Sequence, residues 1–453
     1  MYVSTESYPY RIHPNLVFMS TPAAQPISQS ERITVLDSLR GIAILGILLM
    51  NIPIFSLPDT ISYDPSVRGE TGINFDLWYG ILLTVEGTQR AIFSMLFGAG
   101  IILFINRQES RVTGLAPADY FFRRQLWLIA FSLFDVYILL WPGDILFDYA
   151  CFGMLLFTFR KLAPKALFIA AGICLLLMLG RENRDLYHRK AVIERGEAVA
   201  AIDTTKTKLT TFQKKELEEL NGFRKRSTHE SKVKRAEEEQ AEVLGGYRSA
   251  YESRTDSYID HLVGYLYIQG WDIMICFLLG MAFYKTGVLT GTAPLKVYVW
   301  LTIAGLGLGI PLCYTRIESM IQYNYNWFEI TKNVPLRYYQ LDRILRSLGL
   351  FGLVMALYRV GWLNWLFAML RPVGQMAFTN YLGQSLICSI LFNGFALGLY
   401  GKLERYEIYL VTLSIWVFQI IFCNIWMRFF LYGPFEWLWR TLTYWKAQPF
   451  RKL

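Results

Sequence analysis

The residues best suited to chemistry lie on one apolar helix near the start of the chain. Asp37 and Arg40 are three residues apart, a spacing that puts both side chains on one helical face, where they can pair. Asn51 lies eleven residues after Arg40, about three turns further on and near the same face. Ionisable and polar side chains inside a membrane helix more often serve a function than a purely structural purpose. The pattern predicts a polar track for a ligand; the alternative is a helix-start ion pair, with Asn51 bonded to a neighbouring backbone.

A second candidate is the helix break at Glu86 and Gly87, which Arg90 and Ser94 follow on the next apolar run. A buried carboxylate at a break is a candidate general base. The same carboxylate can instead cap the helix that starts beyond it. Both interpretations stay open at this point.

Arg343 and Arg346 form a third candidate site, because two guanidinium groups one turn apart suit a carboxylate or phosphate ligand. They are therefore candidates for binding the acceptor of a reaction. Pairing with the neighbouring Asp342, or extension of the two side chains to the membrane surface, is the structural alternative.

The fourth candidate is a hydrophobic segment in the C-terminal part of the chain that carries an unusual number of polar side chains. It carries the amides Gln375, Asn380 and Gln384, with Arg371 before it and Tyr381 within it. These side chains predict a lined cavity, or else the hydrogen bonds that join neighbouring membrane helices.

The cysteines have neither metal-ligand nor disulfide-framework spacing. They are interpreted as small buried apolar residues, and no metal site is predicted. All of them lie within or at the edge of apolar segments: Cys151, Cys174, Cys276, Cys313, Cys388 and Cys423.

The elements that must position these residues are membrane helices. Hydrophobic residues make up 54% of the chain and aromatic residues 16%, and the apolar runs are continuous rather than alternating, which excludes a β-barrel. The fold class is therefore an all-α, polytopic membrane bundle. The net charge of +9 comes from short basic loops, as in cytoplasmic loops, and does not indicate a nucleic-acid partner.

About ten transmembrane helices are predicted, with both termini cytoplasmic because the short loops on that side, together with the tail, hold a clear excess of Lys and Arg over the short outer loops. Two short aromatic helices, at 75–85 and 362–369, are predicted to lie in the membrane interface. The protein is thus expected to be multi-pass, in the lipid bilayer of a bacterial inner membrane. The expected spans are 35–55, 91–105, 125–140, 145–159, 166–179, 261–284, 295–314, 340–358, 374–398 and 408–427.

Four regions are expected. Residues 1–30 form a flexible cytoplasmic arm, and 31–180 form an N-terminal transmembrane half that contains the Asp-x-x-Arg-Gly helix. Residues 181–257 form a charged, helical, extracytoplasmic insert, and 258–453 form a C-terminal transmembrane half. The insert is either a solvated hairpin without chemistry or an element that docks a partner.

Several motifs resemble the YeiB-like family of bacterial membrane proteins and its C-terminal domain of unknown function. They occur in the same order and cover nearly the whole chain except the arm and the insert. The motifs are Leu36-Asp37-Ser38-Leu39-Arg40-Gly41-Ile42-Ala43, Glu86-Gly87, Phe93-Ser94-Met95-Leu96-Phe97-Gly98-Ala99-Gly100, Gly280-Met281, Gly374-Gln375-Met376-Ala377-Phe378-Thr379-Asn380-Tyr381 and Gly433-Pro434-Phe435-Glu436-Trp437-Leu438-Trp439-Arg440.

That family resembles the transmembrane acyltransferases, which include surface-glycan O-acyltransferases and heparan-glucosaminide N-acetyltransferase. The resemblance implies that an acyl group passes from cytoplasmic acyl-CoA to an extracytoplasmic acceptor such as a sugar. It places Asn51 where the glycan acyltransferases have a catalytic His. Glu86 is then the expected base, with Asp37 second, and Asn51 binds the donor or polarises the thioester.

The resemblance also implies a donor site for acyl-CoA, with arginines holding the phosphates. Arg343 and Arg346 are left for the acceptor, and a homodimer is a further expectation. A non-enzymatic transporter or ligand-binding protein on the same fold is the alternative. The expected donor-site residues are Arg40, Arg90, Ser94, Arg123, Arg124, Arg371, Gln375, Asn380 and Gln384.

Overall fold

The computed structural model describes residues 33–203, 205–206 and 208–452, so the predicted arm at 1–30 lies outside the described residues. Within these ranges the chain is helical and forms no β-strand, which confirms the predicted all-α class. The elements are α1 (Thr34–Ser56), α2 (Asp59–Tyr63), η2 (Pro65–Arg68), α3 (Ile73–Thr84), α4 (Thr88–Glu109), α5 (Ala116–Tyr137), α6 (Leu146–Leu156), η3 (Phe157–Phe159), α7 (Pro164–Ala200), α8 (Thr211–Arg226), α9 (His229–Leu244), α10 (Tyr247–Lys285), α11 (Leu295–Gln322), α12 (Trp327–Asn333), α13 (Tyr339–Val360), α14 (Asn364–Gln375), α15 (Ala377–Phe392), α16 (Arg405–Phe429) and α17 (Pro434–Tyr444).

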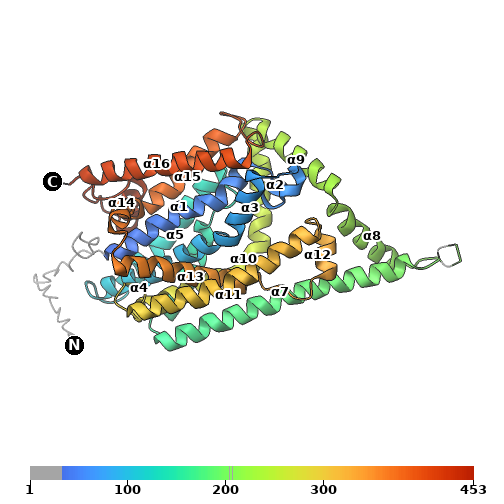
Figure 1. Ribbon diagram of the computed structural model, residues 1–453. Helices are drawn as coiled ribbons and strands as arrows, with labels where there is room; N and C mark the ends of the chain where they lie inside the picture. The colour runs from blue at the N-terminus through green and yellow to red at the C-terminus, as the bar shows by residue number, and fades with distance from the viewer. Residues whose placement is uncertain (1–32, 204, 207, 453) are drawn as a thin grey trace, which may run out of the picture.

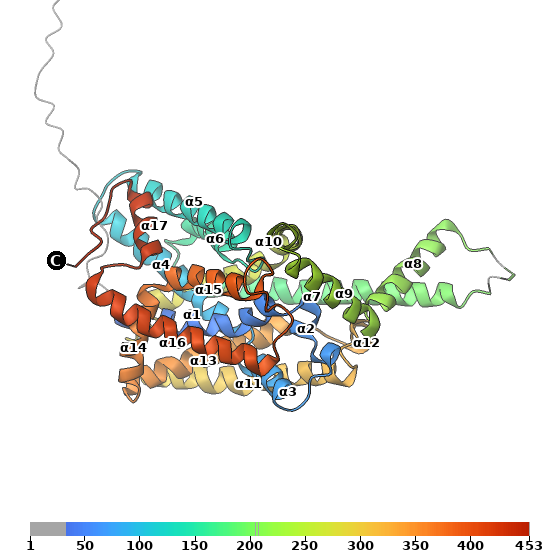
Figure 2. The ribbon, with the colours of Figure 1, turned by 90° about the horizontal axis from the view of Figure 1, so that it is seen from above.

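Most of the long helices run side by side in one bundle, as Figure 1 shows. The start of α1, the end of α4 and helices α14 and α17 lie at one end, called here the basic end for the arginines described below (Figures 1 and 2). Helices α2, α8, α9 and α12 lie at the opposite end, called the insert end. The bundle therefore has two distinct ends, as a protein with one end on each side of a membrane requires.

Five described helices are long and apolar enough to cross a membrane, and the pair α13–α14, bent by 120°, makes six if it is one span. This supports association with a lipid bilayer. Each of the ten segments predicted as spans falls on a helix, although α6 and α15 are shorter than a full span. The membrane bundle is confirmed, and the number of crossings stays a prediction.

Helix α3, predicted to lie in the membrane interface, packs against α11. It continues into α4, and 73–109 together form one candidate span of 37 residues. Trp78 and Leu82 of α3 are buried against Cys313 and Ile317 of α11. The aromatic residues that suggested a surface helix therefore pack inside the bundle.

Glycines permit the closest helix crossings. A Cβ at Gly374 of α14 would lie 1.7 Å from the backbone oxygen of Asp37 on α1. A Cβ at Gly280 of α10 would lie 1.9 Å from the backbone oxygen of Met95 on α4. Only glycine allows these backbones to touch, so both crossings are fixed by the sequence.

The insert is anchored to the bundle instead of being free in solvent. Helix α7 continues past the predicted boundary at 181, and α10 begins before the one at 257. The Lys232 ammonium of α9 lies 2.6 Å from Asp64 and donates to the Tyr325 carbonyl at 2.8 Å, and all three groups are buried. Near it, Arg405 pairs with Glu70 at 2.6 Å. The insert therefore docks on its own chain through ionic contacts.

We expect this docking to weaken as the pH rises, because two acids of the contact are desolvated. The Asp59 backbone N–H donates to Glu239 at 3.0 Å, and the Tyr400 hydroxyl donates to Glu239 at 2.6 Å. Burial raises the pKa of both Asp59 and Glu239 above their ordinary values of 3.8 and 4.5. An acid with a raised folded-state pKa stabilises most below its unfolded pKa and loses that contribution as the pH rises through the folded pKa.

The measurement is the melting temperature of the detergent-solubilised protein and of Glu239→Gln from about pH 4 to about pH 7. The wild type is expected to lose stability relative to Glu239→Gln as the pH rises. The exposed neighbour Glu238→Gln is the control and should track the wild type. A difference that stays constant over this range would contradict the assignment.

Candidate functional site

A cavity of about 240 Å³ enters the bundle from the basic end. Helices α1, α4, α5, α6, α14, α15 and α17 contribute its lining. Arg107 near the end of α4 and Arg111 just after it lie at the basic end, whereas Phe93 and Leu96 of α4 lie at least about 16 Å deeper, at 1.5 Å per residue. The mouth is thus cationic and the depth is apolar. The guanidinium groups of the lining are those of Arg40, Arg107, Arg111, Arg124 and Arg440.

The predicted pair of Asp37 and Arg40 forms in the wall of this cavity. Arg40 Nη1 donates to Asp37 Oδ1 at 3.0 Å, as the three-residue spacing predicted. Gln375 Nε2 of α14 donates to the other oxygen, Asp37 Oδ2, at 3.2 Å. The glycine crossing at Gly374 brings this amide to α1, so three predicted site residues meet here.

Helix α17 closes the opposite wall. The Arg124 guanidinium lies 3.7 Å from the ring centroid of Trp439, and the Trp439 indole N–H donates to the Arg124 carbonyl at 2.9 Å. Such cation–π contacts hold the charged group at the mouth. The neighbouring Arg123 points elsewhere: it pairs with Asp119 and lies over Trp445 at 4.2 Å, so it does not line the cavity.

The N-terminus of α15 is capped by a carboxylate from α17. Glu436 accepts from the backbone N–H groups of Phe378 at 2.7 Å and Thr379 at 3.1 Å, and from the Thr379 hydroxyl at 2.5 Å. A negative charge at a helix N-terminus is stabilising. A Cβ at Gly433 would overlap Glu436, so this glycine permits the approach. The contact locks α17 onto the α14–α15 break.

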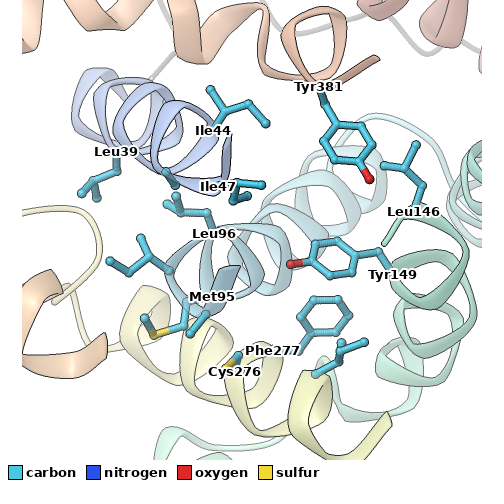
Figure 3. Packing of buried hydrophobic residues seen from close by; sticks show 14 of the residues in the cluster. Leu39, Ile44, Ile47, Met95, Leu96, Leu146, Tyr149, Cys276, Phe277 and Tyr381 are labelled. Atoms are coloured by element: carbon cyan, nitrogen blue, oxygen red, sulfur yellow. The ribbon is translucent and has the colours of Figure 1, made fainter. Parts of the chain in front are cut away.

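Two tyrosines form the deep end of the cavity. Figure 3 shows Tyr149 and Tyr381 with their rings facing the space beside Leu146. The Tyr149 hydroxyl lies 2.5 Å from Ser94 Oγ. The Tyr381 hydroxyl donates to Asp144 at 3.1 Å. The apolar pocket thus ends on hydroxyl groups that connect to polar side chains beyond it.

Glu86 belongs to a separate, buried ion network nearer the insert end. Arg316 lies 2.5 Å from Glu86 and 2.9 Å from Asp342, and Arg346 lies 2.6 Å from Asp342. Along α4 and the preceding turn, Glu86 is about 10 Å from Phe93, the first residue of α4 in the cavity lining, at 1.5 Å per residue. Glu86 thus lies outside the cavity lining and pairs with arginine, and its role as the base of a donor site stays a prediction.

Arg343 and Arg90 share a second buried carboxylate. Asp272 of α10 lies 2.7 Å from Arg90 and also pairs with Arg343. Arg343 further donates to Gln340 at 2.9 Å. Because the Arg343 and Arg346 side chains are each 1% exposed, neither faces an approaching acceptor. Their alternative interpretation, as structural ion pairs, fits the structure.

The remaining predicted residues do not line the cavity. Asn380 donates to the Val373 carbonyl at 2.9 Å, and Gln384 donates to Gln419 at 3.0 Å, so these amides join α15 to its neighbours. Arg371 and the half-buried Asn51 also lie outside the lining. The amides act as helix–helix hydrogen bonds, the alternative that the sequence left open.

Sequence reasoning missed the contribution of α17. Its residues Glu436, Trp439, Arg440 and Tyr444 line the cavity, and three of them fall in the Gly433–Arg440 motif that was noted only as part of a resemblance. The alternation of polar and aromatic residues in this amphipathic segment was the available signal.

Comparisons with known proteins place the chain in a family. Residues 283–446 match the family described as "Protein of unknown function (DUF418)". The chain is 30% identical to the uncharacterized protein YxaH of Bacillus subtilis over 94% of this chain and 98% of that protein. It is 28% identical to the uncharacterized protein YeiB of Escherichia coli over 92% of this chain and 98% of that protein. No solved structure matches the chain at a significant level. The matches to YxaH and YeiB span nearly the whole length on both sides, and the chain therefore belongs to the YeiB-like family.

Proposed function

We propose that this protein binds an anionic molecule with an apolar part, of the acyl-CoA class, in the basic-end cavity. The observation that carries the proposal is the lining, which combines five guanidinium groups with aromatic and aliphatic side chains at depth. Guanidinium groups suit phosphates, and an apolar pocket suits an acyl chain. The basic end would face the cytoplasm of a bacterial inner membrane, by the excess of Arg and Lys there.

The proposed reaction is acyl transfer from this donor. An acceptor O–H or N–H attacks the thioester carbonyl, the C–S bond breaks, and CoA leaves as a thiolate that takes up a proton. Asp37 is the carboxylate in the cavity wall and replaces Glu86 as the proposed base for the acceptor proton. Arg40, beside Asp37 at 3.0 Å, would stabilise the negative charge on the carbonyl oxygen. The acceptor would approach from the insert end, past the tyrosines at the cavity floor.

The test is the binding of palmitoyl-CoA to the purified protein in detergent, with release of free CoA followed over time. Asp37→Asn is expected to keep binding and to lose CoA release by about a hundredfold or more. Glu86→Gln should lower the yield of folded protein but leave CoA release per folded molecule unchanged. Asp119→Asn, at the exposed start of α5, is the matched control.

Arg40→Gln and Arg124→Gln test the mouth of the cavity. Each removes one guanidinium from an anion site, so each is expected to weaken palmitoyl-CoA binding about tenfold or more. An unchanged affinity for palmitoyl-CoA in both variants would contradict the assignment of the donor site.

One observation favours a non-enzymatic transporter or ligand-binding protein as the second candidate. The cavity ends on Tyr149 and Tyr381, and polar side chains continue beyond them towards the insert end. A row of polar side chains of this kind suits the passage of a solute through the bundle. Tight palmitoyl-CoA binding without CoA release, unchanged by Asp37→Asn, would select this candidate, and absence of binding would overturn the donor site itself.

A further inference from the structure

Two neighbouring acidic side chains in the bundle differ from the buried carboxylates that are held in ion pairs. Asp37, Asp64, Asp272 and Asp342 each pair with an arginine or lysine. Asp135, at the end of α5, is completely buried, and among the described residues its carboxyl group faces Ser385 and Asp144 but no arginine or lysine. An ionised carboxylate in such a place is very costly. The described side chains around Asp135 supply no cation, so the carboxyl group needs another neutralising group.

Asp144 lies directly beside Asp135 and is 1% exposed. It accepts hydrogen bonds from the Ser132 hydroxyl, the Tyr381 hydroxyl at 3.1 Å, and the backbone N–H groups of Leu146 at 3.1 Å and Phe147 at 3.2 Å. None of these donors is a cation. Two adjacent carboxyl groups cannot both ionise at low cost, because their charges repel in a low-dielectric site.

We propose that Asp135 and Asp144 form a buried site for one small monovalent cation, a proton or Na⁺. A proton would be shared between two carboxyl oxygens, and Na⁺ would take the same oxygens together with nearby hydroxyls. Either ion leaves one negative charge, which the donors on Asp144 stabilise. The groups that face the pair are Ser132 on α5, Asp148 on α6, Tyr258 on α10, and Tyr381 and Ser385 on α15.

Trp141 lies next to the site. The Trp141 backbone N–H donates to the Asp135 carbonyl at 3.2 Å, and the Trp141 ring, 1% exposed, stacks on Phe55 with ring centroids 3.7 Å apart. Towards the basic end the site meets Tyr381, which also lines the cavity. Tyr381 thus touches both sites and can couple occupancy of one to occupancy of the other, a step that rests on the proposed function.

The first experiment follows the infrared carbonyl band of protonated carboxylic acids in the wild-type protein from about pH 5 to about pH 9. A proton site predicts a band at neutral pH that Asp135→Asn and Asp144→Asn both remove. Asp148→Asn and the exposed Asp119→Asn should retain it. A Na⁺ site predicts instead that ²²Na⁺ binds at about one ion per chain and that both Asn variants of the pair abolish binding.

The wild-type measurements decide the matter even where a variant fails to fold. Absence of the carbonyl band at every pH, together with absence of bound ²²Na⁺, would overturn the site. A band that only Asp148→Asn removes would also overturn it, because the proton would then lie elsewhere.

Coupling is tested separately by adding palmitoyl-CoA to the wild type in weak buffer. Proton uptake, or a change in ²²Na⁺ binding, is expected in the wild type and lost in Tyr381→Phe. If palmitoyl-CoA does not bind at all, the proposed function is refuted. The cation site is then decided by the infrared and ²²Na⁺ results alone. If palmitoyl-CoA binds without either change, the coupling is refuted.

Discussion

Asp272→Ala is expected to lower the free energy of unfolding by about 3 to 5 kcal/mol, the usual loss when one partner of a buried ion pair is removed. Asp272 is 2% exposed and neutralises both Arg90 and Arg343. Without it, two guanidinium groups stay inside the bundle with no carboxylate between them. The measurement is the melting temperature in detergent and the fraction of monodisperse protein after purification.

Two variants make the Asp272 result specific. Glu252→Ala removes an exposed partner of Arg248. The Glu252 side chain is 61% exposed and that of Arg248 is 92% exposed, so this variant should change the melting temperature little. The double variant Asp272→Asn/Arg343→Gln keeps hydrogen-bonding groups without the charges and should recover part of the loss. A mild effect of Asp272→Ala, equal to that of Glu252→Ala, would show that the network does not hold the bundle together.

Gly374→Ala is expected to destabilise the protein by about 1 to 3 kcal/mol and to disrupt the cavity wall. The new Cβ would lie 1.7 Å from the Asp37 carbonyl oxygen and 2.7 Å from the Gly41 backbone nitrogen. Both are backbone atoms, so α1 and α14 must move apart. That movement breaks the hydrogen bond that Gln375 Nε2 donates to Asp37 Oδ2 at 3.2 Å.

The matched control is Gly383→Ala on α15, where nothing lies within 4 Å of an added Cβ. This change should be neutral or stabilising by up to about 1 kcal/mol, because alanine favours the helix. Melting temperature and palmitoyl-CoA affinity are measured for both variants. Equal behaviour of the two would mean that the α1–α14 crossing has more room than the structure gives it.

The local parts of the site were predictable from the sequence because they depend on helical spacing. The Asp37–Arg40 pair follows from three residues of separation, and the Arg346–Asp342 pair from four. The all-α membrane bundle follows from the continuous apolar runs. Asn51 shows the limit: periodicity gives the face of a helix, but it does not give the depth at which a cavity ends.

The partners that decide each residue's role were not predictable, because they are distant in the chain. Glu86 meets Arg316, 230 residues later, and this contact gives the candidate base an ion-pair partner. Gln375 meets Asp37, 338 residues earlier. Spacing carries no information over such separations, since the crossing of non-adjacent helices determines the contact.

The acid pair was missed for a different reason. Asp144 follows Trp141-Pro142-Gly143, and its sequence context is that of an ordinary turn. Asp135 is a single acidic residue near a helix end. Their burial next to one another becomes visible only when α6 folds back along α5 and α15 brings Tyr381 to them.

The position of α17 has a consequence for biosynthesis. Helix α17 follows all the membrane helices in the chain, yet it supplies one wall of the cavity and the cap on α15. Chains are made from the N-terminus, and earlier segments fold while later ones are still being synthesised. While the ribosome is still translating the segment that becomes α17, the membrane helices before it have an incomplete pocket and an open N-terminus on α15. The lining of this cavity is therefore complete only after α17 has been made and has packed against α15.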